Sequence, residues 1–275
     1  MVGLAPPDLD RLALDDKRTY ALLNRGETLG VFQLESEGMR KLLARLKPDC
    51  FEDLIACLAL YRPGPLESGM ADMFIRRKHG QEKIEYPHAS LEPILRDTYG
   101  CIVYQEQVML ISNALGNFSL NEADNLRKAM GKKQPEIMNR FSAQFVAGAV
   151  KNGCAEQAAK ETWEGIVKFG GYGFNKSHAA AYAYLSYATA FFKANYPKEW
   201  MAALMTCDQH DTTKLAKFIG EAKALYIDVL PPDINQASSE FAASKDGIRF
   251  AMAGIKGVGG GVVEMIIENR NRGGS

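Results

Sequence analysis

Several classes of protein are excluded by what this sequence lacks. Its five cysteines are odd in number and form no CxxC pair, which argues against a disulfide framework and a zinc site and favours the cytoplasm. Its 33 basic and 33 acidic residues cancel, so any attraction to phosphate must come from local clusters. The longest apolar stretch, residues 179–192, is too short for the ~30 Å of hydrocarbon in a bilayer, and no signal-peptide pattern precedes it. We expect no membrane role.

Patterns for common catalytic chemistry are missing as well. Ser177 and His178 are neighbours, and neighbouring side chains on a helix point about 100° apart, which does not suit a nucleophile and its base. The CxxH spacing from Cys207 to His210 has no second pair of metal ligands. No convincing pair of carboxylates is placed for two-metal catalysis. The sequence therefore predicts no catalytic residue and no metal site in this chain.

The residues that are present predict a mainly α fold. Apolar positions recur at helical spacing in six stretches, residues 35–46, 51–61, 101–115, 121–130, 135–150 and 155–169. The first 26 residues are expected to form an irregular arm or linker, followed by a short strand-like segment, VFQL, at residues 31–34. Near the other end, short apolar runs around Asp246 and Gly247 predict a β-hairpin. We therefore expect an arm at 1–26, a helical domain at 27–195 and a small α+β segment at 196–275.

One basic stretch, LRKAMGKKQPEIMNR at residues 126–140, is a candidate anion site. It holds five basic residues and one acid, which are Arg127, Lys128, Lys132, Lys133, Arg140 and Glu136. Arginine offers a bidentate fork and lysine a compact charge to a polyphosphate or a nucleic-acid backbone. We expect Gly131 to end a helix after Lys128, so that both basic pairs face one groove. A solvated helix face is the alternative interpretation.

A second candidate is the segment GGYGFNKSHAAAYAY that starts at Gly170. Its glycines allow a sharp turn and a close approach to a ligand, and Asn175 or Ser177 can cap the helix that follows. Free N–H groups at this helix start, together with Lys176 and His178, suit a phosphate. The alanine-rich and tyrosine-rich remainder is better explained as a packed core helix.

A third motif lies near the end of the sequence. The residues IKGVG at 255–259 have the spacing of a helix-hairpin-helix turn, and GVVEMIIENR supplies the second helix. Two glycines let the backbone of such a hairpin approach a DNA phosphate without reading base sequence. The segment before the hairpin, IRFAMAG, has a strand pattern rather than a helical one, so the motif is partial.

Longer motifs carry a resemblance to a known family. The chain resembles the fingers region of the alpha subunit of bacterial DNA polymerase III, a C-family replicative polymerase, from residue 15 to the end. The resemblance rests on GVFQLESEGM (30–39), ALYRPGPLESGM (59–70), TYGCIVYQEQVM (98–109), LRKAMGKKQPE (126–136), GYGFNKSHAAAYA (171–183) and IKGVG (255–259). It implies a helical fingers domain followed by the start of a helix-hairpin-helix region.

The resemblance also implies a division of labour. In that family a palm domain before the fingers holds the aspartates that bind two Mg²⁺ ions, and this chain has no counterpart of it. The implied partners are dNTP, template-primer DNA, the rest of the alpha subunit, and holoenzyme subunits including the sliding clamp, which binds elsewhere. By family analogy Arg127 and Lys128 contact the triphosphate, although the family more often has arginine at both positions.

We group the candidate residues by their expected ligand. The nucleotide group comprises Arg127, Lys128, Lys132, Asn175, Lys176, Ser177 and His178, with Ser36 and Arg62 as outer members. The DNA group comprises Lys133, Lys256, Gly257, Val258 and Gly259. His178 can donate a hydrogen bond or act as a general acid to pyrophosphate, and the sequence does not choose between these roles.

Two interpretations of the chain by itself stay open. It is either a binding module for dNTP or DNA, or a scaffold that functions only when joined to the palm, and in both cases it is expected to be catalytically inactive alone. A nucleic-acid-binding protein outside any polymerase is disfavoured.

Overall fold

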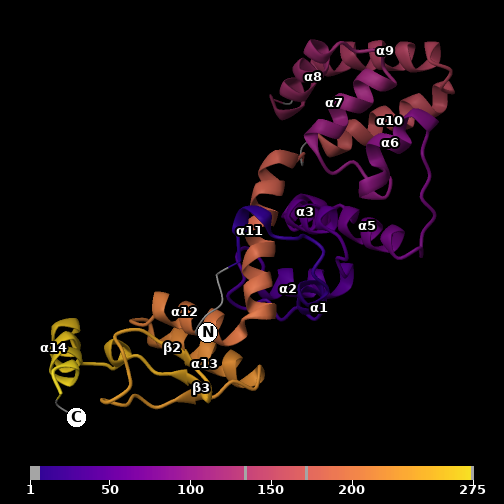
Figure 1. The fold of residues 1–275 in the computed structure, drawn as a ribbon. Coiled ribbons are helices and arrows are strands. Elements are labelled where there is room, and N and C mark those ends of the chain that lie inside the picture. Colours follow the sequence, from indigo (N-terminus) through magenta and orange to yellow (C-terminus); the bar gives the residue numbers. More distant parts are fainter. Residues whose placement is uncertain (1–6, 133–134, 171–172, 274–275) are drawn as a thin grey trace. The chain divides into compact units, whose positions relative to one another are not determined.

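The computed structural model describes residues 7–132, 135–170 and 173–273. The chain divides into two compact units (Figure 1). One, the composite unit, is formed by Met1–Arg40 together with Leu185–Ser275, and the other, the central unit, is Lys41–Tyr184. The sequence-based domain limits at residues 26 and 195 stay predictions about the parent protein.

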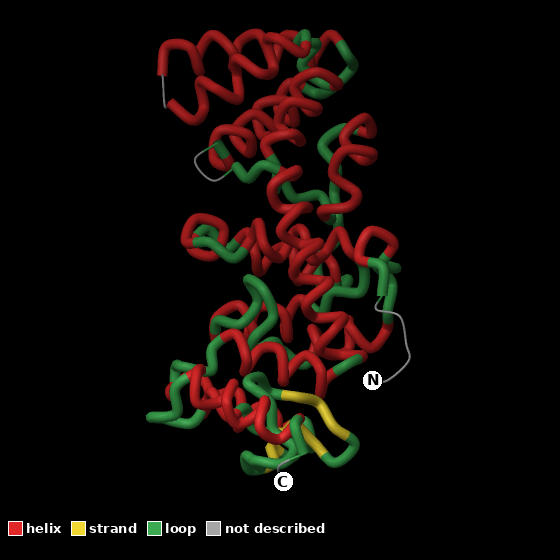
Figure 2. The backbone as a smooth tube through the Cα atoms, turned by 60° about the vertical axis from the view of Figure 1, so that its left-hand side comes forward, coloured by secondary structure: helices red, strands yellow, loops and turns green. Residues whose placement is uncertain are grey.

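The central unit is built almost entirely from helices (Figure 2). Its helices are α3 (Phe51–Leu60), α4 (Pro63–Glu67), α5 (Met70–Lys78), α6 (Glu92–Leu95), α7 (Gln105–Ala114), α8 (Leu120–Lys132), α9 (Pro135–Lys151) and α10 (Glu156–Phe169), with 3₁₀ turns η2 (Ala89–Leu91) and η3 (Arg96–Thr98). Two helices, α2 (Glu37–Leu46) and α11 (Lys176–Asn195), cross the sequence limits of the units.

Aromatic side chains fill the core between α7 and α10. Phe145 of α9 lies between Phe118 and Trp163, with ring centroids 6.3 and 5.5 Å away. The helices approach closely at two glycines, because a Cβ atom on Gly148 would lie only 2.0 Å from the carbonyl oxygen of Gly116. Backbone packing of this kind requires glycine.

The buried side chain of Gln107 holds the turn before α7, which leads to the candidate site. Gln107 of α7 accepts hydrogen bonds from the N–H groups of Val103 and Tyr104 and donates to Thr98 Oγ1 at 2.7 Å. It thereby holds the turn before α7 in place, because buried backbone N–H groups need a partner.

The composite unit combines helices with a small mixed sheet. Its elements are η1 (Leu9–Arg11), α1 (Lys17–Asn24), α12 (Pro197–Cys207), α13 (Thr212–Ala224), β1 (Val229–Leu230), β2 (Ala242–Ser244), β3 (Gly247–Arg249), η4 (Met252–Gly254) and α14 (Gly260–Asn271). The strand order is β1-β3-β2, with β1 parallel and β2 antiparallel to β3. Met201, Met205, Phe218, Phe241 and Ile248 form the core beneath it.

The predicted mainly α fold with a small α+β segment is confirmed. The hairpin is confirmed too, although Ser244 pairs with Gly247, so the turn residues are Lys245 and Asp246. No helix in the described part of the chain is long and apolar enough to cross a membrane.

Three local predictions are wrong. The expected irregular arm contains α1, whose residues Tyr20, Leu22 and Leu23 are buried and therefore gain enough packing to order a short helix. No strand forms at 31–34, because Gly30 and Gln33 have φ angles of +76° and +61° and turn the backbone. Gly131 does not end α8, which continues to Lys132.

Candidate functional site

Four of the nine predicted nucleotide residues, namely Asn175, Lys176, Ser177 and His178, lie at the start of α11. Of the two predicted caps, Asn175 and Ser177, it is Asn175 that caps the helix, because its Oδ1 accepts a hydrogen bond from the N–H of His178 at 2.7 Å. The preceding Gly173 is tightly enclosed, since a Cβ there would lie 2.8 Å from Gln105 Cγ and 3.0 Å from Phe169 Cε1. The turn is therefore anchored against α7 and α10 within the central unit, while Gly171 lies outside the described residues.

A carboxylate that sequence reasoning missed occupies this helix start. Glu106 of α7 accepts hydrogen bonds from Asn175 Nδ2 at 2.9 Å and from the N–H of Lys176 at 3.0 Å. The prediction of free N–H groups here is therefore wrong for Lys176 and His178. The 70 residues between Glu106 and Lys176 explain why no local pattern revealed the contact.

Aromatic and cationic side chains stack along the same helix start. We call Arg62, Phe174, His178 and Tyr182 the stacked row. The Arg62 guanidinium lies 4.2 Å from the Phe174 ring centroid, Phe174 and His178 are 5.6 Å apart, and His178 and Tyr182 are 4.3 Å apart. Burial lowers the pKa of Arg62 from its ordinary value, although an arginine remains charged at neutral pH. The row thus combines a positive charge with exposed aromatic surface.

Lys176 extends the cationic side of the site. Its Nζ lies 5.4 Å from the centroid of the Tyr104 ring. Tyr104 is buried, and this burial raises the pKa of its phenol, so the ring remains a neutral cation–π partner. The structure therefore brings Arg62, Lys176 and His178 together around the Phe174 turn.

The predicted cations on α8 form a separate cluster. Arg127 Nη2 lies 2.8 Å and Lys128 Nζ 2.6 Å from the two carboxylate oxygens of Asp124. These hydrogen bonds, first from Lys128 and then from Arg127, lower the pKa of Asp124. Half-exposed ion pairs of this kind are weak, so a polyphosphate can replace Asp124 as the partner.

The two clusters are connected through the core of the central unit. A Cβ on Gly170 would lie 2.8 Å from Met130 Cε, so the end of α8 packs against the end of α10 just before the glycine turn. Arg127 lies one turn before Met130 on α8. The common groove predicted for Arg127 and Lys176 stays a prediction.

Other predicted members have different outcomes. The backbone of Lys132 belongs to the last turn of α8, not to a following turn, and Lys133 lies outside the described residues. Ser177 is exposed in the first turn of α11. Ser36 belongs to the composite unit, where its hydroxyl accepts a hydrogen bond from the N–H of Met39 at 3.3 Å.

One cluster of potential metal ligands occurs in the described part of the chain, and it does not fit a divalent ion. It consists of Asp49, Cys50 and Asp53. The Lys78 ammonium already lies 3.0 Å from Asp49 and 2.6 Å from Asp53, and burial raises the pKa of the Cys50 thiol to about 12. A cation of the protein itself takes the place that Mg²⁺ would need.

The turn of the helix-hairpin-helix motif, at residues 255–259, is open to solvent. Gly257 has a φ of +89°, and a Cβ on Gly257 or Gly259 would meet no atom within 4 Å. Lys256 is exposed, whereas Val258 packs against a small core with Met252 and Val263. The second helix, α14, is confirmed. The strand predicted before the hairpin is wrong beyond Arg249, because η4 forms one 3₁₀ turn there.

Comparison with known proteins adds three kinds of match. The family model of the bacterial DNA polymerase III alpha subunit finger domain matches residues 5–153, and a helix-hairpin-helix motif matches residues 226–275. The DNA polymerase III subunit alpha of Escherichia coli (strain K12) is 51% identical over 99% of this chain and 24% of that protein. Those of Chlamydia pneumoniae and Aquifex aeolicus (strain VF5) are 52% and 50% identical over 94% and 95% of this chain, and over 21% and 22% of those proteins. The chain thus spans less than a quarter of these relatives.

Proposed function

Because the chain belongs to the bacterial DNA polymerase III alpha subunit finger domain family, we propose that it acts as the fingers of a replicative DNA-directed DNA polymerase. In this role it supplies cations that bind the triphosphate of the incoming dNTP, and its C-terminal hairpin holds template-primer DNA. Metal-binding aspartates and their Mg²⁺ ions would come from the palm of the parent, so the chain by itself is expected to be inactive. The sliding clamp and the other holoenzyme subunits would bind the parent elsewhere.

The observation that supports this proposal best is the cluster around Phe174. Arg62 and Lys176 place two positive charges beside a capped helix start, where the helix dipole also favours an anion. Glu106 already makes contacts there that a phosphate oxygen could make. The cluster therefore offers the geometry of an anion site with a replaceable carboxylate in it.

The chemistry of phosphoryl transfer explains why such a cluster is useful. Negative charge on the triphosphate is neutralised by positioned cations, and pyrophosphate is a better leaving group when it is stabilised or protonated. Lys176 and Arg62 would serve the first purpose. His178, held against Phe174 and Tyr182, would donate a hydrogen bond or a proton to the departing phosphate.

Steady-state kinetics of a full-length alpha subunit test the assignment. Lys176→Ala and Arg127→Ala are each expected to raise KM for dNTP or lower kcat by at least about 10-fold, equivalent to about 1.4 kcal/mol. Lys160→Ala is the matched control, because Lys160 is an exposed lysine on α10 that pairs with Glu156 outside the cluster. Wild-type kinetics in both site variants would contradict the proposed groove.

A scaffold without ligand binding of its own is the second candidate. It is favoured by the ion pairs of Asp124 and by Glu106, which neutralise or occupy the predicted phosphate donors. Titration of the isolated chain with dNTP separates the two candidates. Binding that weakens steeply with salt supports the binding module, whereas no binding at low salt supports the scaffold.

A further inference from the structure

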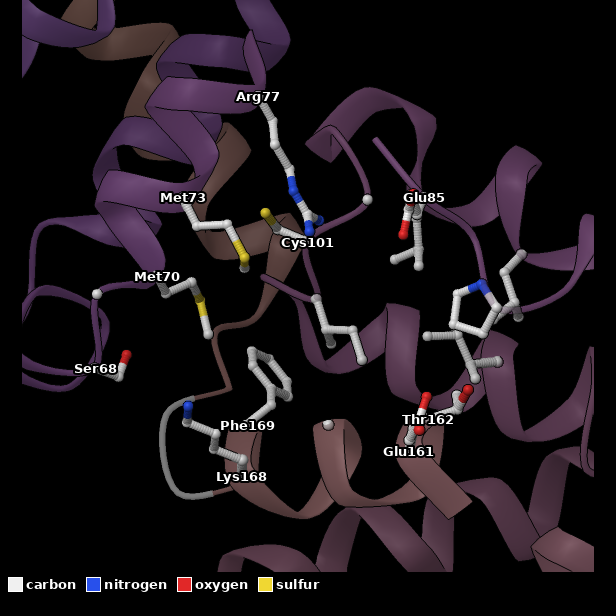
Figure 3. Close-up of a pocket in the computed structure, with 18 of the residues that line it drawn as sticks. Ser68, Met70, Met73, Arg77, Glu85, Cys101, Glu161, Thr162, Lys168 and Phe169 are labelled. Atoms are coloured by element: carbon white, nitrogen blue, oxygen red, sulfur yellow. The ribbon is translucent and has the colours of Figure 1, made fainter. Parts of the chain in front are cut away.

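The central unit contains a cavity of about 590 Å³ that the proposed function does not use (Figure 3). Its walls come from α5, from the segment between Glu85 and Ile102, and from the end of α10. The lining includes Met70, Met73, Leu91, Leu95, Ile102 and Phe169. This volume lies within the range of about 300–1,000 Å³ that small-molecule sites occupy, and the lining is largely apolar as in such sites.

Charges around the cavity are balanced. Three cations and three carboxylates contribute to its lining, namely Arg76, Arg77, Lys168, Asp72, Glu85 and Glu161. Arg76 and Arg77 both pair with Glu82, which reduces their net field further. Because these charges balance, a ligand with a full charge would lose its hydration for little net electrostatic gain, so the lining favours a neutral molecule.

The Arg77 guanidinium can orient a ligand in this cavity. Arg77 extends toward the cavity beside Cys101 (Figure 3). Its Nε donates to Glu82 at 2.9 Å, its Nη1 makes a long contact of 3.5 Å to the carbonyl oxygen of Tyr99, and the guanidinium also interacts with the Cys101 thiol. Because a guanidinium has five N–H donors, it retains capacity to donate to an acceptor on a ligand.

We propose that this cavity binds a neutral aromatic molecule that carries a hydrogen-bond acceptor such as a carbonyl group. The aromatic body lies between Met70, Met73 and Phe169, and the acceptor faces Arg77. Methionine side chains adapt to the outline of a flat ring and make favourable sulfur–aromatic contacts.

The ligand would also restrain the glycine turn. Phe169 forms part of the cavity wall, and the same ring lies beneath Gly173, where a Cβ would approach its Cε1 and Cζ to 3.0 and 3.2 Å. A molecule that fixes the Phe169 ring would therefore limit the movement of Gly173, two residues before the cap of α11. The link to nucleotide binding rests on the proposed function, whereas the binding site does not.

Fluorescence titration of the 275-residue chain with prodan tests the site. Prodan is a neutral naphthalene with a carbonyl group, and its emission shifts to the blue in apolar surroundings. We expect saturable binding and at least a 10-fold loss of affinity in Gly165→Leu. Gly165 lines the cavity from α10, and a Cβ there would meet only Ile102 Cδ1, at 4.0 Å, so a leucine fills the cavity without a clash.

The control is Gly220→Leu on α13 in the composite unit, where a Cβ would also meet no atom within 4 Å. It should bind prodan like the wild type, and both variants should fold because leucine favours a helix more than glycine does. Equal binding by Gly165→Leu and wild type would overturn the site. Tighter binding of the anionic probe anilinonaphthalene sulfonate would overturn the preference for a neutral ligand.

Hydrogen exchange tests the restraint separately. Prodan should slow amide exchange at Phe174–Ala179 in the wild type and not in Gly165→Leu. Saturable binding without slower exchange there would overturn the coupling through Phe169. Because neither measurement involves dNTP or DNA, the result does not depend on the kinetics of Lys176→Ala or Arg127→Ala.

Discussion

At the scale of single residues, Glu106 has the greatest influence on the candidate site. Its carboxylate joins α7 to the start of α11 through Asn175 and Lys176, so it orders the anion site. It also places a negative charge where a triphosphate would approach. In the proposed function, the same residue would therefore preorganise the site and weaken its attraction for the triphosphate.

Removing the negative charge of Glu106 should show how much it weakens the binding of dNTP. Glu106→Gln keeps an oxygen acceptor for the Lys176 N–H but removes the charge, so dNTP affinity should rise about five-fold, since one unit charge at about 4 Å in water is worth about 1 kcal/mol. Fluorescence or calorimetric titration of the chain measures it. Glu156→Gln on α10 is the control, because this exposed carboxylate pairs with Lys160. Weaker binding by Glu106→Gln would show that the ionised carboxylate is needed to hold the helix start.

The cap of α1 predicts a pH dependence of stability. Asp16 accepts hydrogen bonds from the N–H and hydroxyl of Thr19 at 2.8 and 2.7 Å and from Asn195 Nδ2 at 3.0 Å. Burial opposes ionisation, but these hydrogen bonds outweigh it and hold the pKa of Asp16 below its ordinary value of 3.8. The stabilisation is therefore complete above the unfolded-state pKa and is lost as pH falls through the lower folded-state pKa.

We expect Asp16→Ala to lower the free energy of unfolding by about 1 kcal/mol at pH 7. The difference from wild type should shrink below about pH 4, where the wild-type carboxylate becomes protonated. Urea unfolding at several pH values measures it, with Asp8→Ala as the control at an exposed carboxylate. A difference that stays constant down to pH 2 would mean that ionisation of Asp16 contributes nothing.

At the scale of elements, close packing of backbone determines where α9 lies. Gly148 lies in the last turn of this helix and faces the carbonyl of Gly116, which follows α7. Helix propensity alone would favour alanine at position 148. Contact between the two backbones explains glycine at a site where propensity argues against it.

Two glycine substitutions separate the effect of close backbone packing from the effect of helix propensity on stability. Gly148→Ala should lower the free energy of unfolding by about 2 kcal/mol, because the new Cβ forces α9 away from Gly116. Gly131→Ala in α8 is the control, since a Cβ there meets no atom within 4 Å, and it should raise stability by up to about 1 kcal/mol. Urea unfolding measures both changes. Equal effects of the two substitutions would contradict the close approach of α9 to Gly116.

At the scale of the whole molecule, charge is arranged locally. The total is zero, and many basic residues pair with acidic neighbours: Arg76 and Arg77 share Glu82, and Lys78 pairs with Asp53. Among the described residues, the open helix-hairpin-helix turn with the exposed Lys256 is the local group proposed to contact DNA phosphates. Binding should be weak, independent of sequence and dependent on salt.

The salt dependence of DNA binding gives a quantitative test. The slope of log K against log salt for a short primer-template duplex should fall by about 0.9 in Lys256→Ala, because one phosphate contact is lost. Lys217→Ala, at an exposed lysine of α13, is the control. Fluorescence anisotropy at several salt concentrations measures the slopes. An unchanged slope in Lys256→Ala would remove this lysine from the proposed DNA surface.

The sequence by itself determined the fold class, most helices and the β-hairpin, and it limited the cap of α11 to Asn175 or Ser177. These features depend on the apolar period and on residues within a few positions of each other, and both are readable along the chain. Family resemblance, carried by long motifs, supplied the functional hypothesis and was confirmed by the finger-domain match.

Only the tertiary structure decided which charged side chains surround the proposed phosphate site. Glu106 reaches the start of α11 from 70 residues away, and the Phe174 ring joins Arg62 to His178 from two distant segments. The sequence pattern also predicted that α8 ends at Gly131. A local pattern does not include the packing of Met130, which supports the last turn of the helix. Contacts between distant segments depend on the packed core, and no pattern along the chain encodes them individually.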